Sequence, residues 1–215
     1  MLKLVLALAA AALMSACVSL SAEAPLFTTA HQIGPGPPIQ EGVWVQIDDD
    51  CTERAALRRG RLPRGCEPFE LRRAEDGAWT AIFIGTSGES ADEIPPLRLI
   101  IAPAVEGATP QAYVRLYVAE LLPLDPATEP RSIDYAVIAP LGVLPALEMY
   151  LVASIGCEEI LRQGPIEGIA VTNDEQSRVI GCTASTQSAV RTAAQRAFIE
   201  QVDNLDEQRF VRVRD

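Results

Sequence analysis

The chain lacks almost all of the basic side chains on which common enzyme chemistry depends. Lys3 is the one lysine and His31 the one histidine among 215 residues, and His31 lies in a proline-rich segment. A Ser-His-Asp triad, a Ser-Lys dyad, a Schiff base and a phosphate-binding P-loop all need one of these residues in the folded part. We therefore expect a protein that is not an enzyme.

Metal and thiol redox chemistry are disfavoured in the same way. Zinc and copper sites are usually built with histidine, and the chain has no Cys-x-x-Cys motif. The acidic run 48–50 lacks the loop spacing of an EF-hand and is better interpreted as a polar strand end. We expect no metal site and no cofactor.

Long hydrophobic runs are also scarce, and the main one lies at the start of the chain. Residues 4–14 are all apolar and follow Lys3, but a bilayer-spanning helix needs about 20 residues. Small residues then lead directly to Cys17. A basic start, a short apolar run and small residues before a cut site are typical of an export signal.

The end of this signal resembles the lipobox of bacterial lipoproteins. The resemblance implies cleavage before Cys17, a diacylglyceryl thioether on its sulfur and an acylated amino terminus. Because Val18 rather than aspartate follows, it also implies retention at the outer membrane, on the periplasmic face. A plain secretory signal cut elsewhere is the alternative.

Loss of residues 1–16 would leave 17 arginines and 29 acidic residues, a net charge of −12. This charge argues against nucleic acid as a partner. The expected partners are the membrane, through the lipid anchor, and an envelope protein or glycan.

Four cysteines remain in the mature chain, and an exported protein meets an oxidising compartment. They allow three pairings. Spacing favours the two local pairs, since each would enclose one turn-rich insertion: Cys51 with Cys66, and Cys157 with Cys182.

The composition divides the chain into three parts. Residues 1–16 are the signal peptide, 17–41 the acylated N-terminus and a Pro/Gly-rich tether, and 42–215 a single globular domain. Period-two alternation predicts strands at 43–47, 69–73, 79–84, 97–102, 112–120, 133–139 and 147–153. The loop after residue 139 is expected to hold Pro140, Gly142 and Pro145.

Helical spacing predicts a short helix over 53–59 and a longer one from about 185 to 205. Residues 210–214 alternate and fit either an edge strand or a frayed tail. The fold class is therefore mainly β: an antiparallel sheet, small barrel or sandwich of about seven strands with a C-terminal helix. An α+β fold is the alternative.

Two surface features are candidate binding sites. A basic stretch without acids would suit phosphate groups of an envelope glycan, although a solvated loop paired with the nearby acids is the simpler interpretation. It consists of Arg54, Arg58, Arg59, Arg61 and Arg64. Tyr113, Arg115 and Tyr117 share one strand face that would be wet or bind a ligand such as a sugar or a peptide, although cross-strand packing is the simpler interpretation of such side chains.

Two family resemblances bear on function. Gly42-Val43-Trp44, Asp134-Tyr135 and a late helix are similar to lipocalins, which implies a calyx for an apolar ligand. From residue 131 onward, the chain looks like small Gram-negative envelope lipoproteins, a resemblance that carries no known activity. A non-catalytic binding or assembly module is the first hypothesis, a lipocalin-like carrier the second and a carboxylate-based hydrolase the third.

Overall fold

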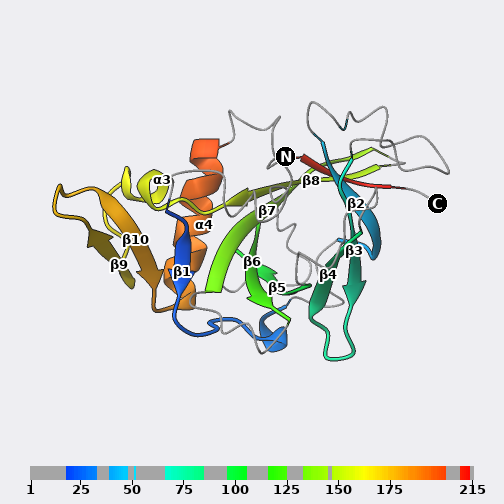
Figure 1. The fold of residues 1–215 in the computed structure, drawn as a ribbon, viewed down its shortest axis with the longest axis horizontal. Helices are drawn as coiled ribbons and strands as arrows, with labels where there is room; N and C mark the ends of the chain where they lie inside the picture. The colour runs from blue at the N-terminus through cyan, green and yellow to red at the C-terminus, as the bar shows by residue number, and fades with distance from the viewer. Residues whose placement is uncertain are drawn as a thin grey trace, which may run out of the picture.

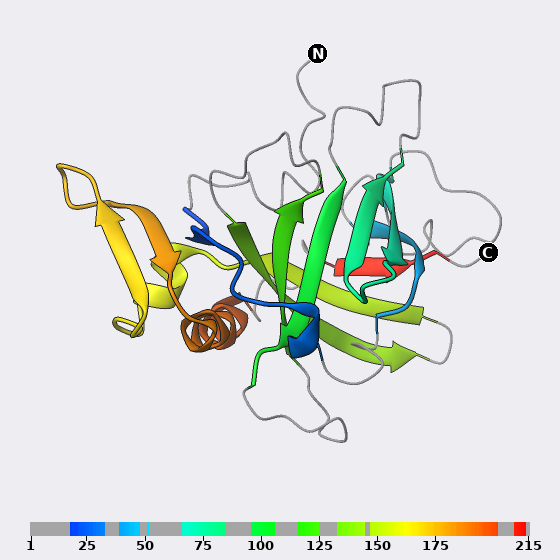
Figure 2. The ribbon, with the colours of Figure 1, turned by 90° about the horizontal axis from the view of Figure 1, so that it is seen from below.

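The computed structural model describes residues 18–32, 39–47, 51, 66–84, 96–105, 116–124, 133–144, 147–201 and 209–213. Side chains are described for these residues except 141–149 and 201. Within them the chain forms an antiparallel barrel with a small sheet extension and a helix on its outer side (Figures 1 and 2). This confirms the mainly β fold class with a C-terminal helix.

Eight strands make the barrel, each paired with its neighbour in an antiparallel ladder. They follow one another around the wall in sequence order, and β6–β7 and β11–β2 pairings complete the ring. The strands are β2 (Gly42–Ile47), β3 (Pro68–Arg73), β4 (Trp79–Phe83), β5 (Leu97–Pro103), β6 (Tyr117–Pro123), β7 (Ile133–Leu144), β8 (Leu147–Ser154) and β11 (Arg209–Arg212). Closure leaves no open edge in this part of the sheet.

Alternation along each strand separates two hydrophobic cores. On β6, Tyr117 and Ala119 belong to the inner core, whereas Val118 packs in the outer core between the barrel wall and α4. Because successive side chains point to opposite faces of a strand, the same sequence supplies both cores at once. A third small cluster lies around Cys51 and Cys66.

The first barrel strand begins at a glycine for a steric reason. Gly42 has φ +137°, and an added Cβ would lie 2.8 Å from Nε of Arg212. Arg212 is in β11, next to β2. A side chain at position 42 would therefore be strained and would displace Arg212 from this junction.

The remaining elements lie outside the barrel. They are β1 (Leu20–Ala22), the 3-10 helix η1 (Thr29–His31), α3 (Cys157–Leu161), β9 (Ile169–Asn173), β10 (Val179–Ala184) and α4 (Gln187–Gln201). Strand β1 pairs antiparallel with the start of β7 and parallel with β10, and β9 is the outer strand (Figure 1). These strands extend the sheet away from the barrel.

Helix α4 packs a face of small residues onto this outer core, as its helical spacing predicted. Ala193, Ala194 and Ala197 are fully buried, and these short side chains let the helix approach the barrel wall closely. Arg196 on α4 donates hydrogen bonds to the carbonyls of Ile160 and Gly164, and these bonds join α4 to α3 and to the turn after it.

The expected tether is wrong for residues 18–32. Leu20 is fully buried, Phe27 is 2% exposed, and β1 forms ladder pairs with two other strands. The prolines and glycines of residues 17–41 suggested an extended linker, but the apolar side chains among them bury enough surface to dock on the outer core. Residue 17 and residues 33–38 lie outside the described part.

Other strand predictions also need correction. Strand β7 continues through Pro140 with a register shift before Val143, where a loop was expected. The insertion between Cys157 and Cys182 contains a helix and two strands that the alternation did not predict. Residues Arg209–Arg212 form β11, which is paired on both sides. The alternating end of the chain is therefore a strand within the barrel wall, neither an edge strand nor a frayed tail.

Candidate functional site

The inner core of the barrel contains a partly open cavity of about 70 Å³. The described residues that line it are all aliphatic or aromatic, and they come from all eight barrel strands and from Ile39 before β2. Such a lining offers dispersion contacts and gives an ordered water almost no partner, so the cavity favours an apolar occupant.

Aromatic rings form one side of this cavity. The Trp44 and Tyr150 rings lie 5.3 Å apart between centroids, and those of Phe69 and Phe210 lie 5.8 Å apart. The Trp44 indole Nε1 donates to the carbonyl of Gln40 at 3.1 Å, which satisfies its polar atom at the edge of the apolar lining. These four rings supply the aromatic part of the lining.

Alanines on three strands create the free space. Ala81 on β4, Ala119 on β6 and Ala136 on β7 are buried and line the cavity. Protein interiors are normally filled to high density, so short side chains at facing positions leave a gap unless a neighbour fills it. The size of the cavity is therefore set by residues that no motif marks.

The volume limits what can be bound. A cavity of about 70 Å³ holds roughly two to three groups the size of a water molecule or a methylene. Pockets for bulky ligands are several times larger, at about 300 Å³ or more. The interior as it stands suits the end of a slender chain.

A buried carboxyl group lies on the opposite side of the barrel wall. Glu120 on β6 is 0% exposed, and its Oε2 accepts hydrogen bonds from the backbone of Leu26 at 2.7 Å, the backbone of Phe27 at 3.0 Å and the Tyr135 hydroxyl at 3.0 Å. Its Oε1 has no partner among the described residues. Burial, together with the neighbouring carboxyl group, raises the pKa of Tyr135, so its hydroxyl stays protonated and donates.

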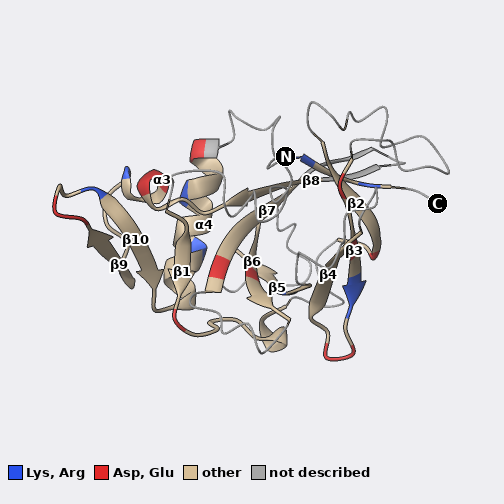
Figure 3. Cartoon of the chain, in the orientation of Figure 1, with Lys and Arg blue, Asp and Glu red and all other residues tan. Residues whose placement is uncertain are grey.

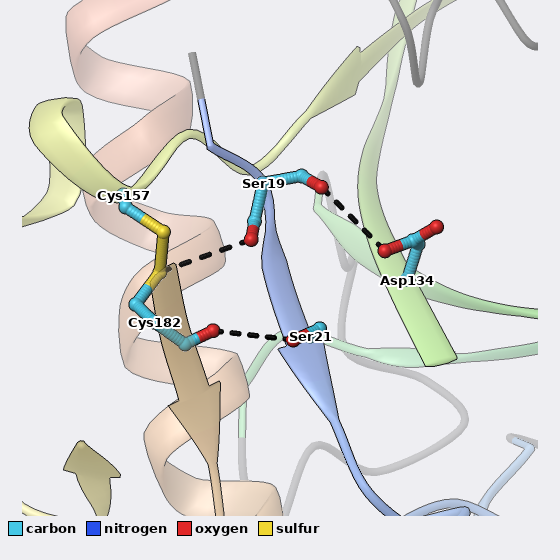
Figure 4. Close-up of a disulfide and its surroundings, with 5 residues drawn as sticks. All are labelled: Ser19, Ser21, Asp134, Cys157 and Cys182. Carbon is cyan, nitrogen blue, oxygen red and sulfur yellow. Dashed lines mark hydrogen bonds between the residues drawn. A yellow bond between two sulfur atoms is a disulfide. The ribbon is translucent and has the colours of Figure 1, made fainter. Parts of the chain in front are cut away.

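A second acid, Asp134, lies on the inward face of β7. Burial raises the pKa of Asp134, and a 3.5 Å hydrogen bond from the Ser19 hydroxyl opposes that shift (Figure 4). Acidic side chains otherwise gather at places such as the β3–β4 and β9–β10 turns, whereas β7 carries one acid near its start (Figure 3). Glu120 and Asp134 therefore lie on opposite faces of the wall and cannot flank one bond.

The predicted disulfides are confirmed. Cys51 pairs with Cys66 and Cys157 with Cys182, with Cα–Cα distances of 4.7 and 5.8 Å. The second bridge joins α3 to β10, next to β1 (Figure 4). Both bridges lie outside the inner core, so they cross-link segments on the outer side of the barrel.

The structure does not gather the other predicted sites into one place. Cys17, the five arginines from Arg54 to Arg64, Tyr113 and Arg115 lie outside the described residues. Tyr117 is 8% exposed in the inner core, so its expected wet face is wrong and its side chain packs inside the barrel. His31 contacts Gln187 of α4 and the Phe27 ring, in the docked N-terminal segment.

Metal-ligating clusters and membrane-crossing helices are both absent from the described residues. No group of three or more metal-ligating side chains lies close together in these ranges. Among the described helices, none has the length and apolar character needed to cross a membrane.

Comparisons of the chain with protein-family models, curated proteins and solved structures found no match. The fold and the cavity are therefore the basis for any statement about function. Sequence reasoning did not identify the cavity residues, because alternation marks a strand face without showing that eight such faces enclose one space.

Proposed function

We propose that the protein is a non-catalytic, lipid-anchored protein of the outer membrane whose barrel binds the chain of a slender apolar ligand. The cavity, whose described lining residues are all aliphatic or aromatic, supports this proposal. A ligand that enters it exchanges water for contacts with Trp44, Leu99 and the other lining side chains, which is favourable in proportion to the apolar area buried. The lipobox-like sequence at Cys17 supports the location.

A hydrolase is the weaker candidate. Glycoside cleavage by two carboxyl groups requires both on one cleft, at a separation of about 5 to 9.5 Å. Glu120 faces the outer core and Asp134 the inner face of the wall, so these two do not supply that arrangement.

The experiment uses ω-bromooctanol, an alkyl ligand whose bromine quenches tryptophan fluorescence on contact. The protein has two tryptophans, and both are buried in the inner core, but Trp44 lines the cavity and Trp79 does not. We expect ω-bromooctanol to quench the wild-type protein saturably. Trp79→Phe should keep this quenching and Trp44→Phe should lose most of it.

Filling the cavity gives the decisive variant. Ala119→Leu places a larger side chain in the gap, so we expect the affinity for ω-bromooctanol to fall at least about tenfold without loss of thermal stability. Ala170→Leu makes the same change on exposed β9 and should bind normally. Unsaturable quenching of the wild type, or equal binding by Ala119→Leu, would refute the proposal.

A further inference from the structure

Asp134 lies beyond the apolar lining of the cavity on the same face of β7, and we infer that it selects ligands whose head group is cationic, with an amine in preference to a carboxylate. The inference rests on the proposed function, since it assigns the head group of the same ligand. It follows from where β7 places Asp134 relative to the cavity and from what surrounds its carboxyl group.

Asp134 continues a row of cavity-lining side chains. Ala136 and Ile138 of β7 line the cavity, and Asp134 is the next residue on the same face of the strand. Its cross-strand neighbour is Leu121 of β6, which also lines the cavity. The strand rises about 13 Å from Asp134 to Ile138, so an octyl chain whose far end lies in the cavity is long enough for its head group to reach Asp134 outside it.

The partners of this carboxyl group are few. In the described part of the chain, its hydrogen bond comes from the Ser19 hydroxyl at the long distance of 3.5 Å. Ser21, directly opposite on β1, donates instead to the carbonyl of Cys182 (Figure 4). In the part of the chain that the structure describes, ion pairs such as those of Arg98 with Asp76 and of Arg178 with Asp174 do not involve Asp134.

A half-buried carboxylate with one long hydrogen bond has lost more solvation than its partners replace. This is the physical cause of its raised pKa. An ammonium group at the end of the cavity would supply both opposite charge and N–H donors, whereas a carboxylate or phosphate head would add repulsion. The net charge of −12 on the chain without residues 1–16 acts in the same direction over longer range.

The test compares two ligands that carry different head groups on the same octyl chain. We expect ω-bromooctylamine to bind the wild-type protein at least about tenfold more tightly than ω-bromooctanoate, by quenching of Trp44. Asp134→Asn removes the charge and keeps the side-chain shape, so the two affinities should become equal within about threefold. Glu175→Gln removes one charge at the exposed β9–β10 turn and should retain the wild-type preference.

The outcomes separate this inference from the function on which it rests. If all three bromooctyl ligands quench the wild type but the amine and the carboxylate bind equally, the protein does not select the head group. The proposed binding of an apolar chain is then unaffected. If Asp134→Asn keeps the tenfold preference, the charge that selects the head lies elsewhere and the assignment to Asp134 is refuted. If neither these chains nor ω-bromooctanol quench, the proposed function fails first.

Discussion

At the residue scale, Glu120 joins three parts of the fold through one oxygen atom. Its Oε2 accepts from Leu26, Phe27 and Tyr135, so loss of the acceptor would leave three donors in an apolar cluster. We expect Glu120→Leu to lower the free energy of unfolding by about 3 to 5 kcal/mol, measured by urea denaturation. The cost arises from unsatisfied donors rather than from lost volume, because leucine fills similar space.

Glu120→Gln tests the role of the hydrogen-bond acceptor, because it keeps an acceptor oxygen at this position. Its amide oxygen can still accept at the same position, so the expected loss is smaller, about 1 to 2 kcal/mol. Exposed Glu175→Gln serves as the control and should change little. Equal stability of Glu120→Leu and the wild type would show that the docked segment does not depend on this carboxyl group.

At the element scale, the docked N-terminal segment differs most from the expected tether. Phe27 packs in the outer core, where its ring meets Tyr135 edge-on at 6.3 Å and lies under the Arg191 guanidinium. We expect Phe27→Ala to cost about 3 to 5 kcal/mol, by thermal or urea unfolding, because it deletes a buried ring and leaves a cavity.

Exposed Pro25 in the same segment supplies the matched control. Pro25→Ala should change stability by less than about 1 kcal/mol, since it removes no buried surface. If residues 18–32 were a free tether, neither substitution would change the stability of the protein. That result would contradict the docking of this segment.

At the scale of the whole molecule, the proposed lipid anchor and the proposed ligand site lie in different parts of the chain. The inner core consists of barrel residues and Ile39, whereas Cys17 directly precedes the segment that docks on the outer core. We expect Cys17→Ser to move the protein from the membrane fraction to the soluble fraction. Its affinity for ω-bromooctanol should stay within about twofold of the wild type, because distant sites act independently.

Mass spectrometry of the wild-type protein supplies the complementary measurement. It should find acyl chains on Cys17 and no residues before it. An unmodified first residue downstream of Cys17, or membrane retention of Cys17→Ser, would refute the anchor without affecting the barrel.

Local patterns predicted most elements because strands and helices depend on neighbouring residues. The alternating runs at 43–47, 69–73 and 133–139 lie in β2, β3 and β7, and the helical stripe at 190–198 lies in α4. Strand β5 shows why alternation could not assign the cores. Ile100, Ile101 and Ala102 are all buried, two against the outer core and one inside the barrel, so both faces of this strand are apolar.

The candidate site depended on contacts between distant residues. Ala81, Ala119 and Ala136 form one gap only when β4, β6 and β7 close into a ring, and β11 from the end of the chain completes that ring. The place of Asp134 also depends on barrel closure, because closure turns its face of β7 toward the inside of the barrel.

The amino-acid sequence by itself determined the β-rich class, the C-terminal helix and the local disulfide pairs. These follow from side-chain periodicity and from cysteine spacing, which act over short stretches of chain. Only the tertiary structure decided that the strands close into a barrel, that the alanines leave a cavity and that residues 18–32 dock. Those properties arise from packing between segments far apart in the chain, which no local pattern encodes.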